Sequence, residues 1–82
     1  MKGWNYRVIK HVSAGEKWFA IHEVYYGKRE KVEAWSQDPI DPMGEDVEDL
    51  TADLELMTRA LSKPVLIEVE IRGKHTLVPL ED

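Results

Sequence analysis

The stretch Asp46–Leu61, DVEDLTADLELMTRAL, predicts one amphipathic helix. Its apolar residues recur at intervals of three and four, which places them on one face of an α-helix: they are Val47, Leu50, Leu54, Met57 and Leu61. The opposite side carries Asp46, Glu48, Asp49, Asp53 and Glu55 against the single basic residue Arg59. Asp46 is the expected N-cap, and Pro64 ends the helix because proline cannot continue it. We therefore expect one side of this helix in a core and negative charge on the outside.

Strands are predicted on both sides of the helix. Residues 4–12 alternate between apolar and polar side chains, 18–26 are rich in aromatic and β-branched residues, and 31–36 read as a third strand. After the helix, residues 65–71 alternate again, and 76–80 form a further short strand. The predicted fold is therefore α+β, in the order β-β-β-α-β with a final β. The short connections favour an antiparallel sheet with the helix packed on one face.

Length and composition restrict the protein to a few classes. Eighty-two residues are expected to form a single α+β domain over 1–82. The chain has no cysteine, which excludes a disulfide or a thiolate metal site. No apolar run approaches the roughly 20 residues of a membrane span, and the N-terminus lacks the apolar core of a signal peptide. These features predict a cytoplasmic protein that does not enter a membrane.

The net charge of −5 is unevenly distributed along the chain. Residues 1–35 carry a net +3, residues 36–62 a net −7 and residues 63–82 a net −1. An acidic middle segment argues against binding to duplex DNA and suits a basic protein partner. The alternative is a solvated helix face that only keeps the protein soluble.

The second predicted strand is apolar on both faces. Trp18, Ala20 and Val24 point to one side, and Phe19, Ile21 and Tyr25 point to the other. Because one helix covers only one face of a sheet, something else must cover the second. We expect a homodimer formed through the sheet. The competing arrangement is a monomer in which residues 74–82 fold back over that face.

No group of residues in the sequence has the spacing of a catalytic or metal site. The three histidines, His11, His22 and His75, lack a metal-ligand spacing, and the acidic residues of segment 38–46 lack the pattern of a calcium loop. No serine lies in a nucleophile elbow, and no glycine-rich loop could hold a phosphate. We therefore expect a protein that is not an enzyme, with no catalytic residues, cofactor or metal.

Protein interaction is the function that the sequence favours, through the acidic helix or through the sheet. The candidate interaction residues are Glu48, Asp49, Asp53 and Glu55 on the helix and Trp18, Phe19, Ile21, Tyr25 and Trp35 on the strands. The alternative function is single-stranded nucleic-acid binding, because the strand aromatics lie near Lys10, Lys17, Lys28, Arg29 and Lys31. The sequence signature of an RNA-binding sheet is absent, so packing explains the aromatics better.

These elements together resemble the N-terminal domain of HicB-type antitoxins. The segment GEDVEDLTADLELMTRAL is similar to that family's G-x-[ST]-x-E-E-A helix, at Gly44, Val47, Glu48 and Asp49. The resemblance covers about residues 4–71 and implies a β-β-β-α-β unit related to a partial ribonuclease-H fold without its catalytic carboxylates. It also implies toxin neutralisation as the function.

Two departures separate the chain from that family. Tyr26-Gly27-Lys28 stands where the family has a P-D-x-P-G segment, and the residues after Pro64 do not supply its DNA-binding module, which makes operator binding doubtful. The chain also resembles small uncharacterised bacterial proteins that share I-H-E-V-Y-Y, here Ile21–Tyr26, and L-x-x-M-x-x-A-L-x-K-P-V-L, here Leu54–Leu66. That second resemblance implies no function.

Overall fold

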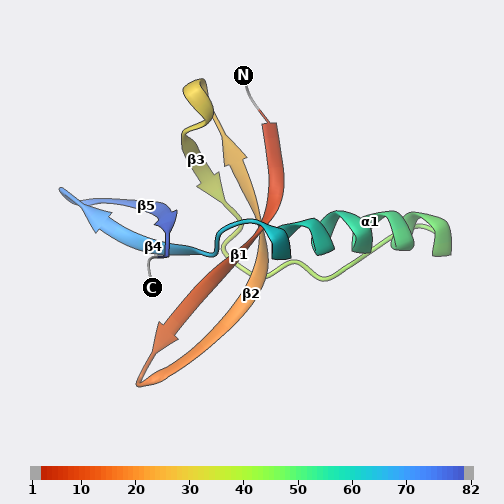
Figure 1. The fold of residues 1–82 in the computed structure, drawn as a ribbon, viewed down its shortest axis with the longest axis horizontal. Coiled ribbons are helices and arrows are strands. Elements are labelled where there is room, and N and C mark those ends of the chain that lie inside the picture. Colours follow the sequence, from red (N-terminus) through yellow and green to blue (C-terminus); the bar gives the residue numbers. More distant parts are fainter. Residues whose placement is uncertain (1–2, 81–82) are drawn as a thin grey trace.

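A computed structural model describes residues 3–80 and shows an α+β fold with five strands and one α-helix (Figure 1). The elements are β1 Gly3–Ser13, β2 Glu16–Tyr26, the 3-10 turn η1 Lys28–Glu30, β3 Val32–Trp35, α1 Val47–Arg59, the 3-10 turn η2 Ala60–Ser62, β4 Leu66–Ile71 and β5 Lys74–Pro79. Every element that the sequence predicts is present, with bounds shifted by a few residues.

The five strands form one mixed sheet in the order β3-β2-β1-β4-β5. β1 pairs with β2, β2 with β3, and β4 with β5, all antiparallel, as predicted. However, β4 runs parallel to β1, so the prediction of a purely antiparallel sheet is wrong. The reason is the connection through α1. β3 ends at one end of the sheet, and the connection through α1 carries the chain back to the end at which β3 begins. β4 starts there and therefore runs in the same direction as β3 and β1.

The elements extend in several directions from a small centre (Figure 1). β1 and β4 are paired only at Ile9–Leu66 and Lys10–Ile67 and then diverge. The β1–β2 hairpin continues beyond this point to the pair Ser13–Glu16, and we call its residues 10–19 the β1–β2 arm. In Figure 1 this arm, α1 and the β4–β5 hairpin point in three different directions. Several large apolar side chains away from the centre are exposed, among them Phe19, Leu54 and Ile71.

Side chains are buried on both faces of the sheet at this centre. On the α1 side, a cluster of Tyr6, Val8, Met57 and Ala60 is extended by Ile21, Ile40 and Val65. On the other side, a cluster of Ile9, Val24, Leu66 and Leu77 is extended by Tyr26, Val32 and Trp35. The second face of β2 is thus covered near Val24 by β5, which corresponds in part to the predicted fold-back of the C-terminal segment. On the α1 side of β2, Phe19 and Tyr25 remain exposed.

The start of α1 agrees with the sequence prediction. The carboxylate of Asp46 accepts a hydrogen bond from the backbone N–H of Asp49 at 2.8 Å, which is the expected N-cap. Just before it, Gly44 passes so close to the helix that a Cβ there would lie 2.3 Å from the backbone nitrogen of Leu50. A side chain at position 44 would therefore push the loop away from the helix.

The rotation of α1 about its own axis differs from the prediction. The residues that face the sheet are Asp53, Met57 and Ala60, and only Met57 of the predicted apolar stripe is buried. Val47, Leu54 and Leu61 are 78%, 45% and 70% exposed, and Leu50 is partly buried. The prediction that the whole stripe lies in a core is therefore wrong. Only the C-terminal part of α1 lies on β1, and there a polar bond between Tyr6 and Asp53 takes the place of a leucine contact.

Candidate functional site

The outer side of α1 carries an exposed apolar stripe. We call Val47, Leu54 and Leu61 the outer stripe; they are seven residues apart and so lie along one side of the helix. Glu48 and Glu55 follow these residues in the sequence and are also exposed. Exposed apolar side chains beside charged ones occur at protein-interaction surfaces.

Among the acidic residues predicted to bind a partner, Asp53 has an internal role. Its carboxylate accepts hydrogen bonds from the Tyr6 hydroxyl at 2.6 Å and from the backbone N–H of Met43 at 3.0 Å. These two bonds, with that from Tyr6 the stronger, lower the pKa of Asp53 below its usual value. Asp53 therefore joins α1, β1 and the preceding loop, while Glu48, Asp49 and Glu55 are exposed.

The predicted interaction residues of the strands are not gathered at one site. The pairing of β1 with β2 places Phe19, Ile21 and Tyr25 on the α1 side and Trp18 on the other. Ile21 and Trp35 pack against the two buried clusters and are partly buried. The structure therefore does not present these residues as one continuous aromatic platform.

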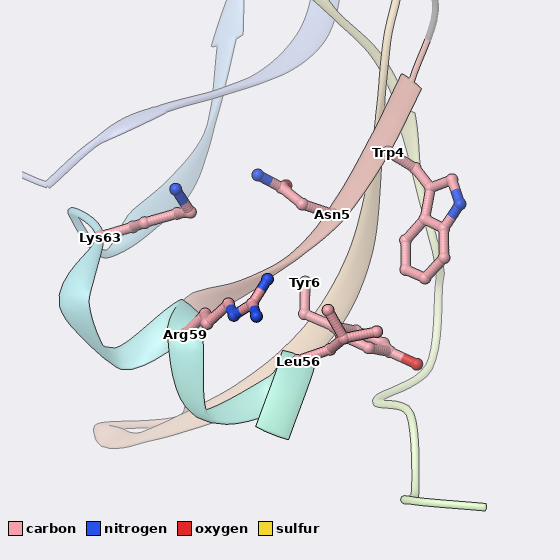
Figure 2. A pocket seen from close by; sticks show the side chains of 6 residues that line it. All are labelled: Trp4, Asn5, Tyr6, Leu56, Arg59 and Lys63. Atoms are coloured by element: carbon pink, nitrogen blue, oxygen red, sulfur yellow. The ribbon is translucent and has the colours of Figure 1, made fainter. Parts of the chain in front are cut away.

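A groove that the sequence reasoning missed lies between the C-terminal part of α1 and the start of β1. This Trp4 groove has a volume of about 320 Å³ and is lined by Trp4, Asn5, Tyr6, Leu56, Arg59 and Lys63. Trp4 is half exposed and meets the ring of Tyr6 edge to face at 5.2 Å. Figure 2 shows the nitrogen ends of Asn5 and Lys63 turned toward one another near the Arg59 guanidinium, with Trp4 on the opposite side. The groove thus has a basic end and an apolar end.

A second hollow continues along the same side of α1 toward its N-terminus. It is lined by Met43, Gly44, Glu45, Asp49, Ala52, Asp53 and Leu56, so it shares Leu56 with the Trp4 groove. Its charged lining residues are all acidic, whereas those of the Trp4 groove are both basic. One side of the helix therefore changes from acidic to basic on passing Leu56. The signal in the sequence was the recurrence of Ala52, Leu56, Arg59 and Lys63 at intervals of four, three and four.

Two histidines meet on the face of the sheet away from α1. The Nε2 atoms of His11 and His22 are 2.9 Å apart, and Nδ1 of His22 lies 2.9 Å from the carbonyl oxygen of Ser36. A carbonyl only accepts, so Nδ1 of His22 donates to Ser36, and its Nε2 accepts from His11. The ring of His11 stacks on Trp18 at 5.3 Å. This chain of bonds needs a neutral His22.

Burial is the main influence on the buried member of this pair. His22 is 1% exposed, and the cost of burying a charge lowers its pKa below the ordinary 6.5. The nearby His11 acts in the same direction, while the bond to Ser36 and the charge of Asp38 act against it. Within residues 3–80, no three histidine or acidic side chains are close enough together to hold a metal ion.

No family model, no curated protein and no solved structure matched the chain. Between residues 3 and 80 no helix has both the length and the apolar character needed to cross a membrane.

Proposed function

We propose that this chain is a non-enzymatic protein-interaction domain that binds a basic protein through the outer side of α1. The observation that carries the proposal is the exposure of Val47, Leu54 and Leu61 on a helix whose other side is seated on the sheet. Leaving large apolar side chains in water is unfavourable, and a partner that covers them gains the corresponding free energy.

The charge beside the outer stripe is the argument for a basic partner. Glu48 and Glu55 are exposed, and residues 36–62 carry a net −7. Exposed charges of one sign accelerate association with a surface of the opposite sign and disfavour partners of the same sign. An antitoxin-like role, in which the domain neutralises a small basic toxin, is the specific form of this proposal that the resemblance to HicB-type antitoxins suggests.

A second candidate function is single-stranded nucleic-acid binding by the β1–β2 arm. The observation in its favour is the half-exposed ring of Trp18, which stacks on His11, although Lys17, its neighbour in the sequence, points to the other face of the arm. Stacking of a base on an exposed aromatic ring, together with nearby positive charge, is how such proteins hold a single strand. Against it, Phe19 lies on the other face of the arm, so successive bases would not find successive rings.

Capture from a lysate of the source organism, with and without nuclease, distinguishes the two functions. We would compare the wild-type chain with Leu54→Ser/Glu55→Lys, which changes the outer stripe, and with Trp18→Ala, which changes the arm. A partner protein that is retained after nuclease treatment and lost with Leu54→Ser/Glu55→Lys is the expected result. The captured protein would then be purified and titrated against both variants.

Two other outcomes have clear meanings. Capture that disappears with nuclease and with Trp18→Ala would favour nucleic-acid binding. A purified partner that binds wild type and Leu54→Ser/Glu55→Lys equally would contradict a role for the outer stripe. The product of the gene next to this one is the first partner to test, because antitoxin-like function predicts a small basic ribonuclease-like protein there.

A further inference from the structure

The side of α1 that bears the two hollows repeats in a regular pattern. Six residues recur at intervals of four, three, four, three and four. The four of them that lie in α1 have the spacing that keeps side chains along one side of a helix facing a second helix, while the first precedes the N-cap of α1 and the last follows η2. The six residues are Glu45, Asp49, Ala52, Leu56, Arg59 and Lys63. We call them the mixed-charge stripe, and all six line the hollow or the Trp4 groove.

The charges of this stripe are separated along its length. Glu45 and Asp49 lie toward the N-terminal end, Arg59 and Lys63 toward the C-terminal end, and Ala52 and Leu56 lie between them. Within residues 3–80, the only close contact between a basic and an acidic side chain joins His75 and Glu68, so neither Arg59 nor Lys63 is paired with a carboxylate in this part of the chain. The stripe thus has unpaired positive charge at one end and negative charge at the other.

The numbering of the stripe is symmetric about one position. Asp49 and Arg59 lie at equal distances on either side of residue 54, about 7.5 Å each along the helix axis. Ala52 and Leu56 are also equidistant from residue 54, whereas Glu45 and Lys63 are equidistant from it only in the sequence, because both lie outside α1. A two-fold axis level with residue 54, on the side of α1 that carries Ala52 and Leu56, therefore places Asp49 opposite Arg59 and Ala52 opposite Leu56 on a second copy. An interface of this kind must be complementary to itself, which few surfaces are.

We infer that a second copy of this chain docks on the mixed-charge stripe, with the two α1 helices antiparallel. Asp49 of each copy then meets Arg59 of the other, and Leu56 fills the space above the small Ala52. This dimer is formed through α1 and not through the sheet.

The dimer leaves the proposed partner surface free. Val47, Leu54 and Leu61 lie on roughly the opposite side of α1 from Ala52 and Leu56, because each residue advances about 100° around the helix. Both copies can therefore bind a partner at the same time. The inference does not depend on the proposed function, and its test uses the purified chain alone.

Charge reversal at the central pair tests the arrangement. Wild-type protein is expected to be a dimer at tens of micromolar by light scattering and sedimentation. Asp49→Lys and Arg59→Glu should each raise the dimer dissociation constant by about tenfold or more. In a dimer of either variant, both contacts between positions 49 and 59 would join like charges. An equimolar mixture of these two variants should dimerise again, because both pairs then join opposite charges. Glu55→Lys, the matched charge change outside the stripe, should leave the dimer intact.

Cross-linking gives a readout that does not depend on charge. The chain contains no cysteine, so single cysteines report only the designed contact. Ala52→Cys mixed with Leu56→Cys should form a disulfide-linked dimer faster than either variant alone. Circular dichroism of every variant checks that it is folded.

Three results would overturn the inference. The first is a wild-type monomer at several hundred micromolar. The second is a dimer that Asp49→Lys and Arg59→Glu leave unchanged. The third is a dimer in which the two cysteine variants show no preference for each other, which would place the contact elsewhere, for example on the sheet.

Discussion

Tyr6 of β1 donates its hydroxyl hydrogen to Oδ1 of Asp53 in α1 over 2.6 Å, and this bond joins the helix to the sheet beside the buried Met57. The same carboxylate accepts the backbone N–H of Met43, so one side chain connects a strand, a helix and the loop between them. Since Asp53 must face β1 to make this bond, the leucines on the neighbouring side of α1 are turned toward solvent. The exposed outer stripe follows from that rotation.

The first prediction concerns the ionisation of Tyr6. Burial, followed by the bond to Asp53, raises the pKa of Tyr6 from 10.0 to about 12. A pKa that is raised in the folded state means that stability is complete below pH 10 and is lost as the pH rises toward 12. Ultraviolet titration should show one tyrosine ionising near pH 12, and Tyr6→Phe should remove that component. A Tyr6→Phe titration curve that retains it would contradict the assignment.

The second prediction compares two apolar residues of α1. Met57 is 4% exposed, so Met57→Ala should lower the free energy of unfolding by about 2–5 kcal/mol. Leu54 is 45% exposed, and Leu54→Ala should cost less than about 1 kcal/mol. Urea denaturation of both variants at equal concentration measures the difference. Equal losses would mean that Leu54 is buried in solution by a contact that the single chain does not show.

The third prediction is a loss of stability in mild acid. His22 is buried in its neutral form with a lowered pKa, so the unfolded chain takes up a proton near pH 6.5 while the folded chain does not. Stability is therefore complete above about pH 6.5 and falls as the pH drops below it. Urea midpoints at pH 7.5 and 5.5 should differ more for wild type than for His22→Gln. His75→Gln, at an exposed position, serves as the control and should keep the dependence that His22 causes.

The fourth prediction is that duplex DNA does not bind appreciably at physiological salt. The net charge is −5, and α1 presents exposed acidic side chains that would repel phosphates. A mobility-shift assay with random duplex should show no complex at micromolar protein. Submicromolar binding that weakens as salt is added would contradict the prediction that the acidic side chains prevent binding to duplex DNA.

Local patterns in the sequence determined the elements of this fold. The alternation in residues 4–12 and 65–71 predicted β1 and β4, and the Asp46 cap marked the start of α1, because these signals depend only on neighbours in the chain. Among the candidate interaction residues, Glu48, Asp49 and Glu55 lie exposed as expected. Their carboxylates are charged, and burying an unpaired charge is unfavourable in any arrangement of the elements.

The tertiary structure decided what the elements do together. The parallel pairing of β4 with β1 depends on how the α1 connection crosses the sheet, and no residue of β4 encodes its direction. The rotation of α1 depends on a bond between residues 47 positions apart, Tyr6 and Asp53, which periodicity cannot reveal. Because that rotation exposes Leu54 and opens the groove beside Trp4, the surfaces available for binding became visible only once helix and sheet were packed together.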